Sequence, residues 1–340
     1  MSNQSEIRTQ PKASCICCGS QGTYLYQGLE DRLFGAAGVW SLKRCDDGQC
    51  GLLWLDPTPI NEDIHLAYKD YYTHTKSPTT KESMFSRLLA GYRAYKYQYL
   101  VEKTTLLQRV TGRALSFFNF FKEHMDYPFV YFKDLEKGKL LELGMGSGDT
   151  LKLFSNWGWQ VEGLDFDPEA VKYAASQGLK VYEGDIFSQQ FPDESFDAIF
   201  SSHVLEHVPD PINLMQESLR ILKPGGLFVA VTPNASSKLH KAFKSSWREL
   251  DPPRHLNIFT YQALQMAAMK AGFSKLEIVS SNYSATGVCF ISYKIARYNV
   301  TKMHDYSFFK YVAYLVRLFL NLTHRFSRMS GEELVLIAYK

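Results

Sequence analysis

Long uninterrupted apolar stretches are absent from this 340-residue sequence. The nearest approach, residues 308–322, is interrupted by Lys310 and Arg317, so we expect no membrane-spanning helix, which would need about 20 apolar residues. Residues 1–14 are polar and lack the apolar segment of a secretory signal. These two absences predict a cytoplasmic protein.

A strong excess of either charge is also absent. The formal net charge is +3, which is too small to indicate a polyanion such as nucleic acid as the partner. Hydrophobic residues make up 45% of the chain and charged residues 21%, proportions that exclude a disordered chain and are typical of a folded one. In a cytoplasmic protein the six cysteines are expected to be reduced or metal-bound, not paired in disulfides.

The sequence lacks internal repeats, and it divides into three regions of different character. Residues 1–60 hold five of the six cysteines and many turn residues, and residues 61–135 are rich in Tyr, Phe, Lys and Arg. Beyond them, strand-like apolar runs alternate with helical patterns, which indicates a parallel sheet with crossover helices. We predict a cysteine-rich module over 1–60, a helical lid or linker over 61–135, and an α/β domain over 136–340 with a helical insertion at 285–330.

Seven strand-like segments in the third region predict a Rossmann-like, doubly wound α/β fold. The segments are 139–143, 160–164, 179–182, 196–201, 227–232, 275–280 and 333–338. The run Lys223-Pro224-Gly225-Gly226 predicts a helix end and a turn before the fifth strand.

A glycine-rich loop follows the first of these strands. Leu141–Asp149 reads LELGMGSGD and places glycine at Gly144, Gly146 and Gly148. Glycines let the backbone turn sharply and approach a ligand closely, and the start of the following helix offers free N–H groups. The pattern predicts that a cofactor binds at this end of the sheet.

The spacing of the glycines distinguishes two kinds of cofactor. A dinucleotide site has the pattern G-x-G-x-x-G, whose last glycine would fall at Asp149. An acid there would repel a pyrophosphate, whereas S-adenosylmethionine (SAM) has no phosphate and carries sulfonium and ammonium cations. Glu142, just ahead of the loop, favours a cation for the same reason. The motif therefore favours SAM.

Further candidate cofactor-binding residues follow the next two strands. Asp165 lies about 20 residues past the loop, where an acid binds ribose hydroxyls, and Phe166 is placed to lie against adenine. Asp185 and Ile186 follow the third strand, and Asp185 is a candidate acceptor for the adenine amino group. Because parallel strands end at one edge of a sheet, we expect these residues to form one site.

Together these segments resemble class I SAM-dependent methyltransferases, in particular the branch that includes ubiquinone-biosynthesis-type O-methyltransferases. The resemblance is strongest over 139–234, and it also covers SHVLEHVPDP at 202–211 and LKPGG at 222–226. It implies a seven-stranded sheet whose last strand is antiparallel, and it adds Ser202 to the residues that bind SAM.

Two histidines are candidates for catalysis. An acceptor hydroxyl must lose its proton on methylation, so a nearby base helps. Similar methyltransferases carry an Arg-His-x-x-x-Phe-Thr-like segment where this chain has Arg254 and His255. We therefore take His255 as the preferred base, Arg254 as a candidate anchor for an anionic substrate group, and His203, just past the fourth strand, as a second catalytic candidate. The alternatives are a loop clamp for His255 and a helix cap for His203.

The cysteines near the N-terminus form two close pairs. Cys15-x-x-Cys18 and Cys45-x4-Cys50 can each hold one side of a tetrahedral zinc ion. The second spacing is longer than the common one, Cys17 is a competing neighbour, and free structural thiols remain the alternative. Residues 50–72 also resemble a bacterial methyltransferase family in which a cysteine knuckle precedes the catalytic domain; this resemblance implies a glycan, a lipid or another small molecule as acceptor.

Three functions remain open from the sequence. We favour methyl transfer to oxygen of a small-molecule, glycan or lipid-linked acceptor. A zinc-ribbon RNA methyltransferase would use the basic helices, but no RNA-binding motif accompanies them; a non-catalytic scaffold is the third interpretation. The basic, aromatic segments 84–132 and 289–329 predict a lid or a homodimer face in preference to a peripheral membrane contact.

Overall fold

The computed structural model describes five stretches of the chain. They are residues 6–69, 84–116, 119–297, 307–324 and 329–340. Parts of the predicted lid and of the predicted insertion therefore lie outside the described residues. No helix in these stretches is long and apolar enough to cross a membrane.

The chain divides into two compact units. Unit 1 contains residues 1–72, 202–219 and 230–339, and unit 2 contains residues 73–201 and 220–229 with Lys340. Each unit is described separately below.

A seven-stranded sheet is present, as predicted. Its strands are β6 (Lys139–Leu143), β7 (Gln160–Asp165), β8 (Lys180–Glu183), β9 (Phe196–Ser202), β10 (Leu222–Pro233), β12 (Lys275–Ser281) and β13 (Glu333–Tyr339). Their order is β12-β13-β10-β9-β6-β7-β8. Strand β6 is parallel to β7 and β9, β7 is parallel to β8, and β13 is antiparallel to β12. This topology confirms the predicted α/β fold with its antiparallel last strand.

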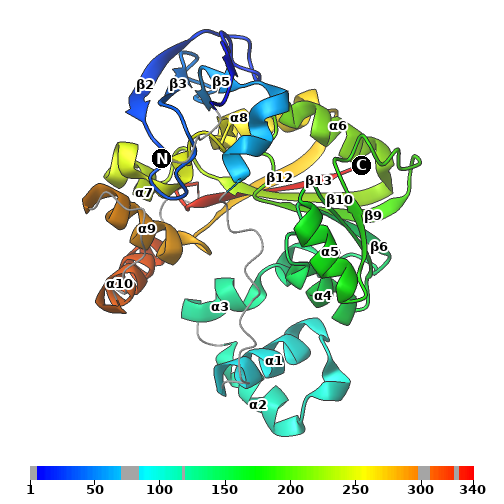
Figure 1. The fold of residues 1–340 in the computed structure, drawn as a ribbon. Coiled ribbons are helices and arrows are strands. Elements are labelled where there is room, and N and C mark those ends of the chain that lie inside the picture. Colours follow the sequence, from blue (N-terminus) through cyan, green and yellow to red (C-terminus); the bar gives the residue numbers. More distant parts are fainter. Residues whose placement is uncertain (1–5, 70–83, 117–118, 298–306, 325–328) are drawn as a thin grey trace. The chain divides into compact units, whose positions relative to one another are not determined.

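Unit 2 holds the parallel strands β6–β9 and the crossover helices between them. Helices α4 (Asp149–Asn156) and α5 (Pro168–Ser176) lie next to each other beside these strands (Figure 1). Helix α5 begins at Pro168, which suits the first turn of a helix, and the side chain of Asp167 caps it. The unit also contains α1 (Met84–Tyr97), α2 (Leu106–Leu115) and α3 (Asn119–Asp126).

Unit 1 contains a second sheet of four strands in the order β11-β4-β3-β2. Strands β2 (Gly22–Leu29), β3 (Trp40–Cys45) and β4 (Leu53–Leu55) come from the N-terminal region, whereas β11 (Asn257–Ile258) follows β10 in the chain. A small sheet pairs β1 (Thr9–Gln10) with β5 (Thr58–Pro59). The segment that carries Arg254 and His255 thus leads directly into the N-terminal sheet.

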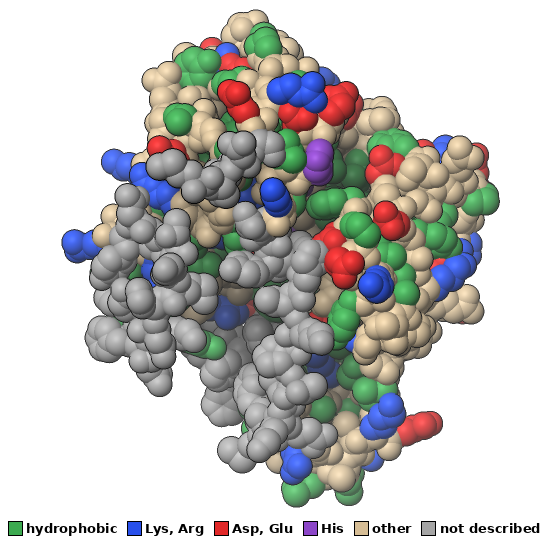
Figure 2. Space-filling model, viewed as in Figure 1, with side chains coloured by type: hydrophobic (Ala, Val, Ile, Leu, Met, Phe, Trp, Pro, Cys, Tyr) green, Lys and Arg blue, Asp and Glu red, His purple; other side chains and the backbone are tan. Residues whose placement is uncertain are grey.

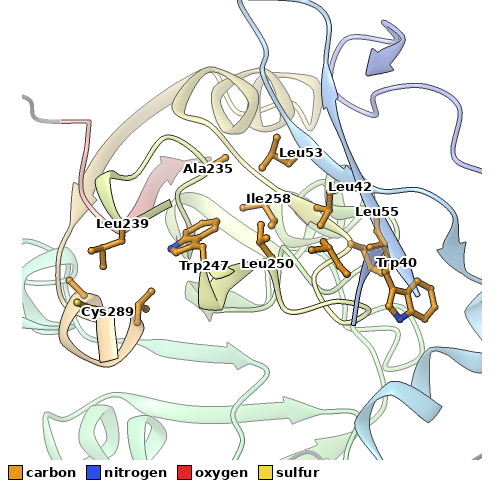
Figure 3. Packing of buried hydrophobic residues seen from close by; sticks show 14 of the residues in the cluster. Trp40, Leu42, Leu53, Leu55, Ala235, Leu239, Trp247, Leu250, Ile258 and Cys289 are labelled. Atoms are coloured by element: carbon orange, nitrogen blue, oxygen red, sulfur yellow. The ribbon is translucent and has the colours of Figure 1, made fainter. Parts of the chain in front are cut away.

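One hydrophobic cluster joins these parts of unit 1 (Figure 3). Trp40 and Leu42 of β3 and Leu55 of β4 pack in the same cluster as Trp247 and Leu250. Each such side chain stabilises the fold by about 1.5–3 kcal/mol when fully buried. The cysteine-rich region and the segment after β10 therefore share one core.

The remaining helices complete the two units. They are α6 (Pro211–Ile221), α7 (Lys238–Phe243), α8 (Tyr261–Lys270), α9 (Ala285–Arg297) and α10 (Ser307–His324), with short 3₁₀ helices at Asn61–Tyr68, Val101–Lys103, Phe129–Tyr131, Lys244–Ser246 and Arg248–Leu250. Helices α9 and α10 fall between β12 and β13 in the chain, and both contribute side chains to the cluster of Figure 3.

The start of β10 differs from the prediction. The strand begins at Leu222, directly after α6, so the predicted turn at residues 223–226 was wrong. The backbone N–H of Gly225 donates to the carbonyl of Lys340 at 3.0 Å, and the N–H of Lys340 donates to the carbonyl of Gly226 at 3.0 Å. Pairing with the distant C-terminus thus extends the strand through residues that favour a turn locally.

Candidate functional site

The glycine loop of unit 2 adopts the backbone conformation that its sequence predicts. Gly144, Gly146 and Gly148 have φ angles of +66°, +51° and +75°, a region that other residues enter only at a cost. A side chain at Gly148 would lie 2.7 Å from Leu179, whereas the space beside Gly146 is open. The loop ends at α4, whose first residue is Asp149.

Two buried acids flank this loop. Glu142 in β6 is 3% exposed, and its Oε2 atom has no hydrogen-bond partner among the residues that the structure describes. Burial, reinforced by the nearby charges of Asp165 and Asp149, raises the pKa of Glu142 well above its usual value. Burial also raises the pKa of Asp165, which ends β7 and accepts hydrogen bonds from the N–H groups of Gly146 (2.8 Å) and Asp167 (3.0 Å). A cation would stabilise the charged form of Glu142, so this residue fits the cationic part of SAM, whereas Asp165 stands where an acid binds ribose hydroxyls.

Aromatic side chains follow β7 and β8. Phe166 is 54% exposed and Phe187 is 42% exposed, so the ring of each is accessible to a ligand. Asp185 accepts a hydrogen bond from the N–H of Ser188 at 2.7 Å, and Ile186 is buried. Sequence reasoning missed Phe187, although its position two residues after Asp185 was a usable signal.

Ser202 and His203 begin the part of unit 1 that follows β9. Ser202 is half-buried at the end of the strand. His203 has a φ angle of +55°, a strained conformation that clusters at functional sites. Its ring lies between two carboxylates, with Nδ1 3.0 Å from Glu206 and Nε2 3.1 Å from Glu333. Burial alone would lower the pKa of His203, but the two carboxylates outweigh burial and raise it well above the usual value.

His255 has the opposite electrostatic character. It is 2% exposed, and its Nδ1 donates to the carbonyl of Glu249 at 2.7 Å. Burial, followed by repulsion from His207, lowers the pKa of His255 to about 3. His255 is therefore neutral at physiological pH, with the lone pair on Nε2, which lies 4.0 Å from Asp251.

His207 lies beside His255, with the ring centroids 4.6 Å apart in an edge-to-face arrangement. Its Nδ1 atom lies 2.9 Å from the Tyr68 hydroxyl and 3.2 Å from the carbonyl of Arg254. One ligand atom from each of Glu206, His207 and His255 lies within 4.8 Å of the others, so this group is also able to hold a metal ion.

Arg254 is enclosed in unit 1. Its guanidinium donates to both carboxylate oxygens of Asp251, at 3.0 and 2.7 Å, and to Asp31 at 2.7 Å. Burial alone would lower the pKa of Arg254, but the two aspartates outweigh burial and raise it. The guanidinium also lies 4.7 Å from the ring of Phe34. These contacts favour a role in holding the loop over the predicted role as a substrate anchor.

The four predicted zinc ligands meet in unit 1. The Sγ atoms of Cys15 and Cys50 are 3.6 Å apart, and those of Cys18 and Cys45 are 3.3 Å apart. These separations are far from the roughly 2.05 Å of a disulfide and near the value of about 3.8 Å that a tetrahedron with Zn–S distances of about 2.3 Å requires. One sulfur from each residue lies within 4.8 Å of the others. The donor set therefore fits zinc, and Cys17 lies outside it.

Glycines explain how two short segments converge on this point. Gly19 follows Cys18 with a φ angle of +80°, and Gly51 follows Cys50 with a φ angle of +65°. The N–H of Gly19 donates to the carbonyl of Cys15 at 2.8 Å. The turn thus brings both thiols of the first pair to one side, as in zinc knuckles.

Comparison with known proteins identifies the domain. Residues 121–278 match a family described as "Methyltransferase domain". The chain carries a class I SAM-dependent methyltransferase domain. The match begins ahead of β6 and ends within β12, so it includes the glycine loop and the strand-end acids of unit 2, and His203, His207 and His255 of unit 1.

Curated relatives support this assignment. The chain is 30% identical over 233 residues to the biotin biosynthesis bifunctional protein BioHC of Cellvibrio japonicus, covering 67% of this chain and 41% of that protein. It is 36% identical over 108 residues to a ubiquinone biosynthesis O-methyltransferase of Xanthomonas oryzae pv. oryzae, covering 30% of this chain and 45% of that one. The chain thus spans less than half the length of these relatives.

A SAM-dependent methyltransferase of Archaeoglobus fulgidus is similar in structure, with a TM-score of 0.44 and 19% identity over 64% of this chain and 92% of that one.

Proposed function

We propose that the protein transfers the methyl group of SAM to an oxygen atom of a small-molecule, glycan or lipid-linked acceptor. The observation that carries the proposal is the glycine loop after β6 with the buried Glu142 beside it, whose Oε2 has no hydrogen-bond partner in the described part of the chain. SAM supplies a methyl group on a sulfonium, which an aligned nucleophile attacks directly. The names of the ubiquinone biosynthesis O-methyltransferases among the relatives support oxygen as the methylated atom.

SAM binding would use groups from several strand ends. Gly144, Gly146 and Gly148 let the backbone approach the cofactor, and Glu142 faces its cationic part. The further residues in the proposal are Asp165 for the ribose, Phe166 and Phe187 for the faces of the adenine, Asp185 and Ile186 for its edge, and Ser202 at the end of β9.

His255 is the proposed base for the acceptor hydroxyl. A base must be unprotonated before it acts, and the low pKa of His255 meets this condition, whereas His203 between its two carboxylates is held as the charged imidazolium. Asp251, 4.0 Å from Nε2, would stabilise the charge that His255 gains. His203 is then proposed to act on the acceptor through its positive charge, because both of its ring N–H groups already donate to Glu206 and Glu333. The structural alternative for His255 is a clamp that holds the loop through the Glu249 carbonyl.

A labelling experiment tests the function. The protein incubated with isotopically labelled SAM and a cell extract should label a product that mass spectrometry detects in the small-molecule or lipid fraction. Label in RNA instead would support the RNA methyltransferase interpretation. SAM binding without any labelled product would support the non-catalytic scaffold.

Asp165→Ala should weaken SAM binding. The change removes charge-assisted hydrogen bonds, which contribute roughly 1.5–3 kcal/mol, so we expect the dissociation constant to rise by about 10- to 150-fold. Calorimetric titration measures the effect, with Asp134→Ala as the control, because Asp134 is an exposed carboxylate of the same unit. Unchanged affinity in Asp165→Ala would remove this residue from the ribose role.

A further inference from the structure

Helix α2 of unit 2 exposes apolar side chains that a folded protein usually buries. Leu106, Leu107 and Val110 are 71%, 72% and 57% exposed. They lie in the first turns of the helix, on one side of it. An exposed group of large aliphatic side chains of this kind marks an interaction surface.

Helix α2 is stabilised by a capping box at its start and by packing against α1. Thr105 and Gln108 form a reciprocal capping box at its start. On its opposite side α2 packs against α1 so closely that a Cβ atom on Gly112 would lie 2.3 Å from the backbone of Gly91. Because that side is occupied by α1, the leucines face away from this helix pair.

Basic residues border the exposed leucines. Lys103 and Arg113 are exposed, and Arg113 lies 5.9 Å from the ring of Tyr95, which is itself exposed. Arg109 is half-buried on the same helix, and its Nε atom has no hydrogen-bond partner in the described part of the chain. Glu102 is the only acid in the sequence from residue 84 to residue 116. Figure 2 shows hydrophobic and basic side chains intermixed over the region that Figure 1 labels α1 and α2.

We propose that this surface, here called the α2 face (Tyr95, Lys103, Leu106, Leu107, Val110 and Arg113), docks onto an anionic lipid bilayer. Aliphatic side chains on the outer side of a helix enter the boundary between headgroups and acyl chains, while Lys and Arg reach back to the anionic headgroups. The positive charge of the face and the negative charge of such a bilayer are complementary.

A second copy of the chain fits this surface less well. In a symmetric dimer the same patch meets itself, so the basic residues of both copies would be brought together and would repel each other. Helix α10 provides a contrast, because its exposed side chains Leu315, Phe319 and Leu322 have no exposed basic residue among the described residues 312–322. Among the described side chains, exposed apolar and exposed basic residues therefore occur together on α2 and not on α10.

The proposal does not depend on the methyl-transfer reaction, since the face lies on a helix outside the family match. Docking onto a bilayer would give the protein access to acceptors that reside there. Vesicle binding and methyl transfer are measured separately, so either proposal can fail while the other stands.

Co-sedimentation of the full-length protein with vesicles tests the proposal. The protein should bind vesicles of equal parts phosphatidylglycerol and phosphatidylcholine and should not bind phosphatidylcholine alone. Lys103→Glu with Arg113→Glu should lower binding by at least about 25-fold, since each basic residue near an anionic surface contributes roughly fivefold. Leu106→Ser with Leu107→Ser should lower it by more than about tenfold.

A matched control pair is available on α8. Met269 and Lys270 are also exposed, and Met269→Ser with Lys270→Glu should leave binding unchanged. Thermal unfolding establishes that each variant is folded. The proposal is overturned if the wild-type protein does not bind anionic vesicles, or if binding depends on Leu315 and Phe319 and not on the α2 face. It is also overturned if the wild-type protein is a dimer and Leu106→Ser with Leu107→Ser makes it a monomer in sedimentation experiments.

Discussion

Cys15→Ser with Cys18→Ser should leave the purified protein without zinc and without a folded N-terminal region. Structural zinc contributes on the order of 10–16 kcal/mol to small zinc-dependent folds, which equals or exceeds the total stability of a typical domain, about 5–15 kcal/mol. Removing two of four ligands should abolish that contribution. Elemental analysis should find one zinc ion per wild-type chain and none in the variant, and thermal unfolding should show a large loss of stability.

Cys17→Ser is the control for this experiment. Cys17 is buried beside the four ligands but lies outside the donor set, so its replacement should leave the zinc content unchanged. A wild-type protein that contains no zinc and unfolds identically with and without a strong chelator would contradict the prediction of a zinc site. The four cysteines would then be free thiols.

The loss of stability in Cys15→Ser with Cys18→Ser should extend beyond residues 1–60. Strand β11 pairs with β4, with Asn257 opposite Trp54, and Thr260 donates to the carbonyl of Cys50. Asp31 from the N-terminal region also pairs with Arg254, next to the proposed base. Removing one partner of a buried ion pair lowers protein stability by about 3–5 kcal/mol. Loss of structure around Asp31 should therefore destabilise the loop that holds His255.

His255→Ala should lower the turnover number by about 10²–10⁴-fold, the range typical of a general base, while leaving SAM affinity within about twofold of the wild type. The turnover number should fall because no base remains to accept the proton of the acceptor hydroxyl. SAM affinity should persist because the proposed SAM contacts are made by other residues. Initial rates of label transfer measure the first quantity, and calorimetric titration measures the second. Equal losses in both would identify His255 as a structural clamp.

His203→Ala is the comparison for this prediction. If its turnover defect exceeds that of His255→Ala, our ranking of the two histidines is wrong. Each variant also needs a thermal unfolding measurement, because the hydrogen bond of His203 is partly buried and that of His255 is buried.

The pH dependence follows from the low pKa of His255, about 3. Since the base is already neutral, its protonation should not reduce the rate between pH 8 and pH 6. Stability should behave differently. The unfolded chain binds this proton near pH 6.5 and the folded chain only near pH 3, so this contribution to stability is full above pH 6.5 and is lost progressively on acidification below it.

The sequence alone determined the local features of the fold. Apolar runs at residues 139–143, 160–164 and 196–201 predicted strands of a parallel sheet, and all three are strands in the structure. The glycine loop was equally readable, because only glycine adopts the positive φ angles at 144, 146 and 148 without strain. The cysteine spacing pointed to the four residues whose thiols meet.

Tertiary structure decided whatever depends on groups distant in the chain. Strand β10 begins at Leu222 because Lys340 pairs with Gly225 and Gly226, against the local preference for a turn. The charges of the two histidines differ because Glu206 and Glu333 stabilise the imidazolium of His203, whereas burial disfavours the charged form of His255.

The same reason applies to the loop of Arg254. Its partner Asp31 is 223 positions away in the chain, so no spacing rule could have paired them. Sequence reasoning recognises chemistry that lies within one turn, one loop or one strand, because local backbone preferences set it. Protonation states and ion pairs are set by desolvation and by charges that only the folded chain brings together.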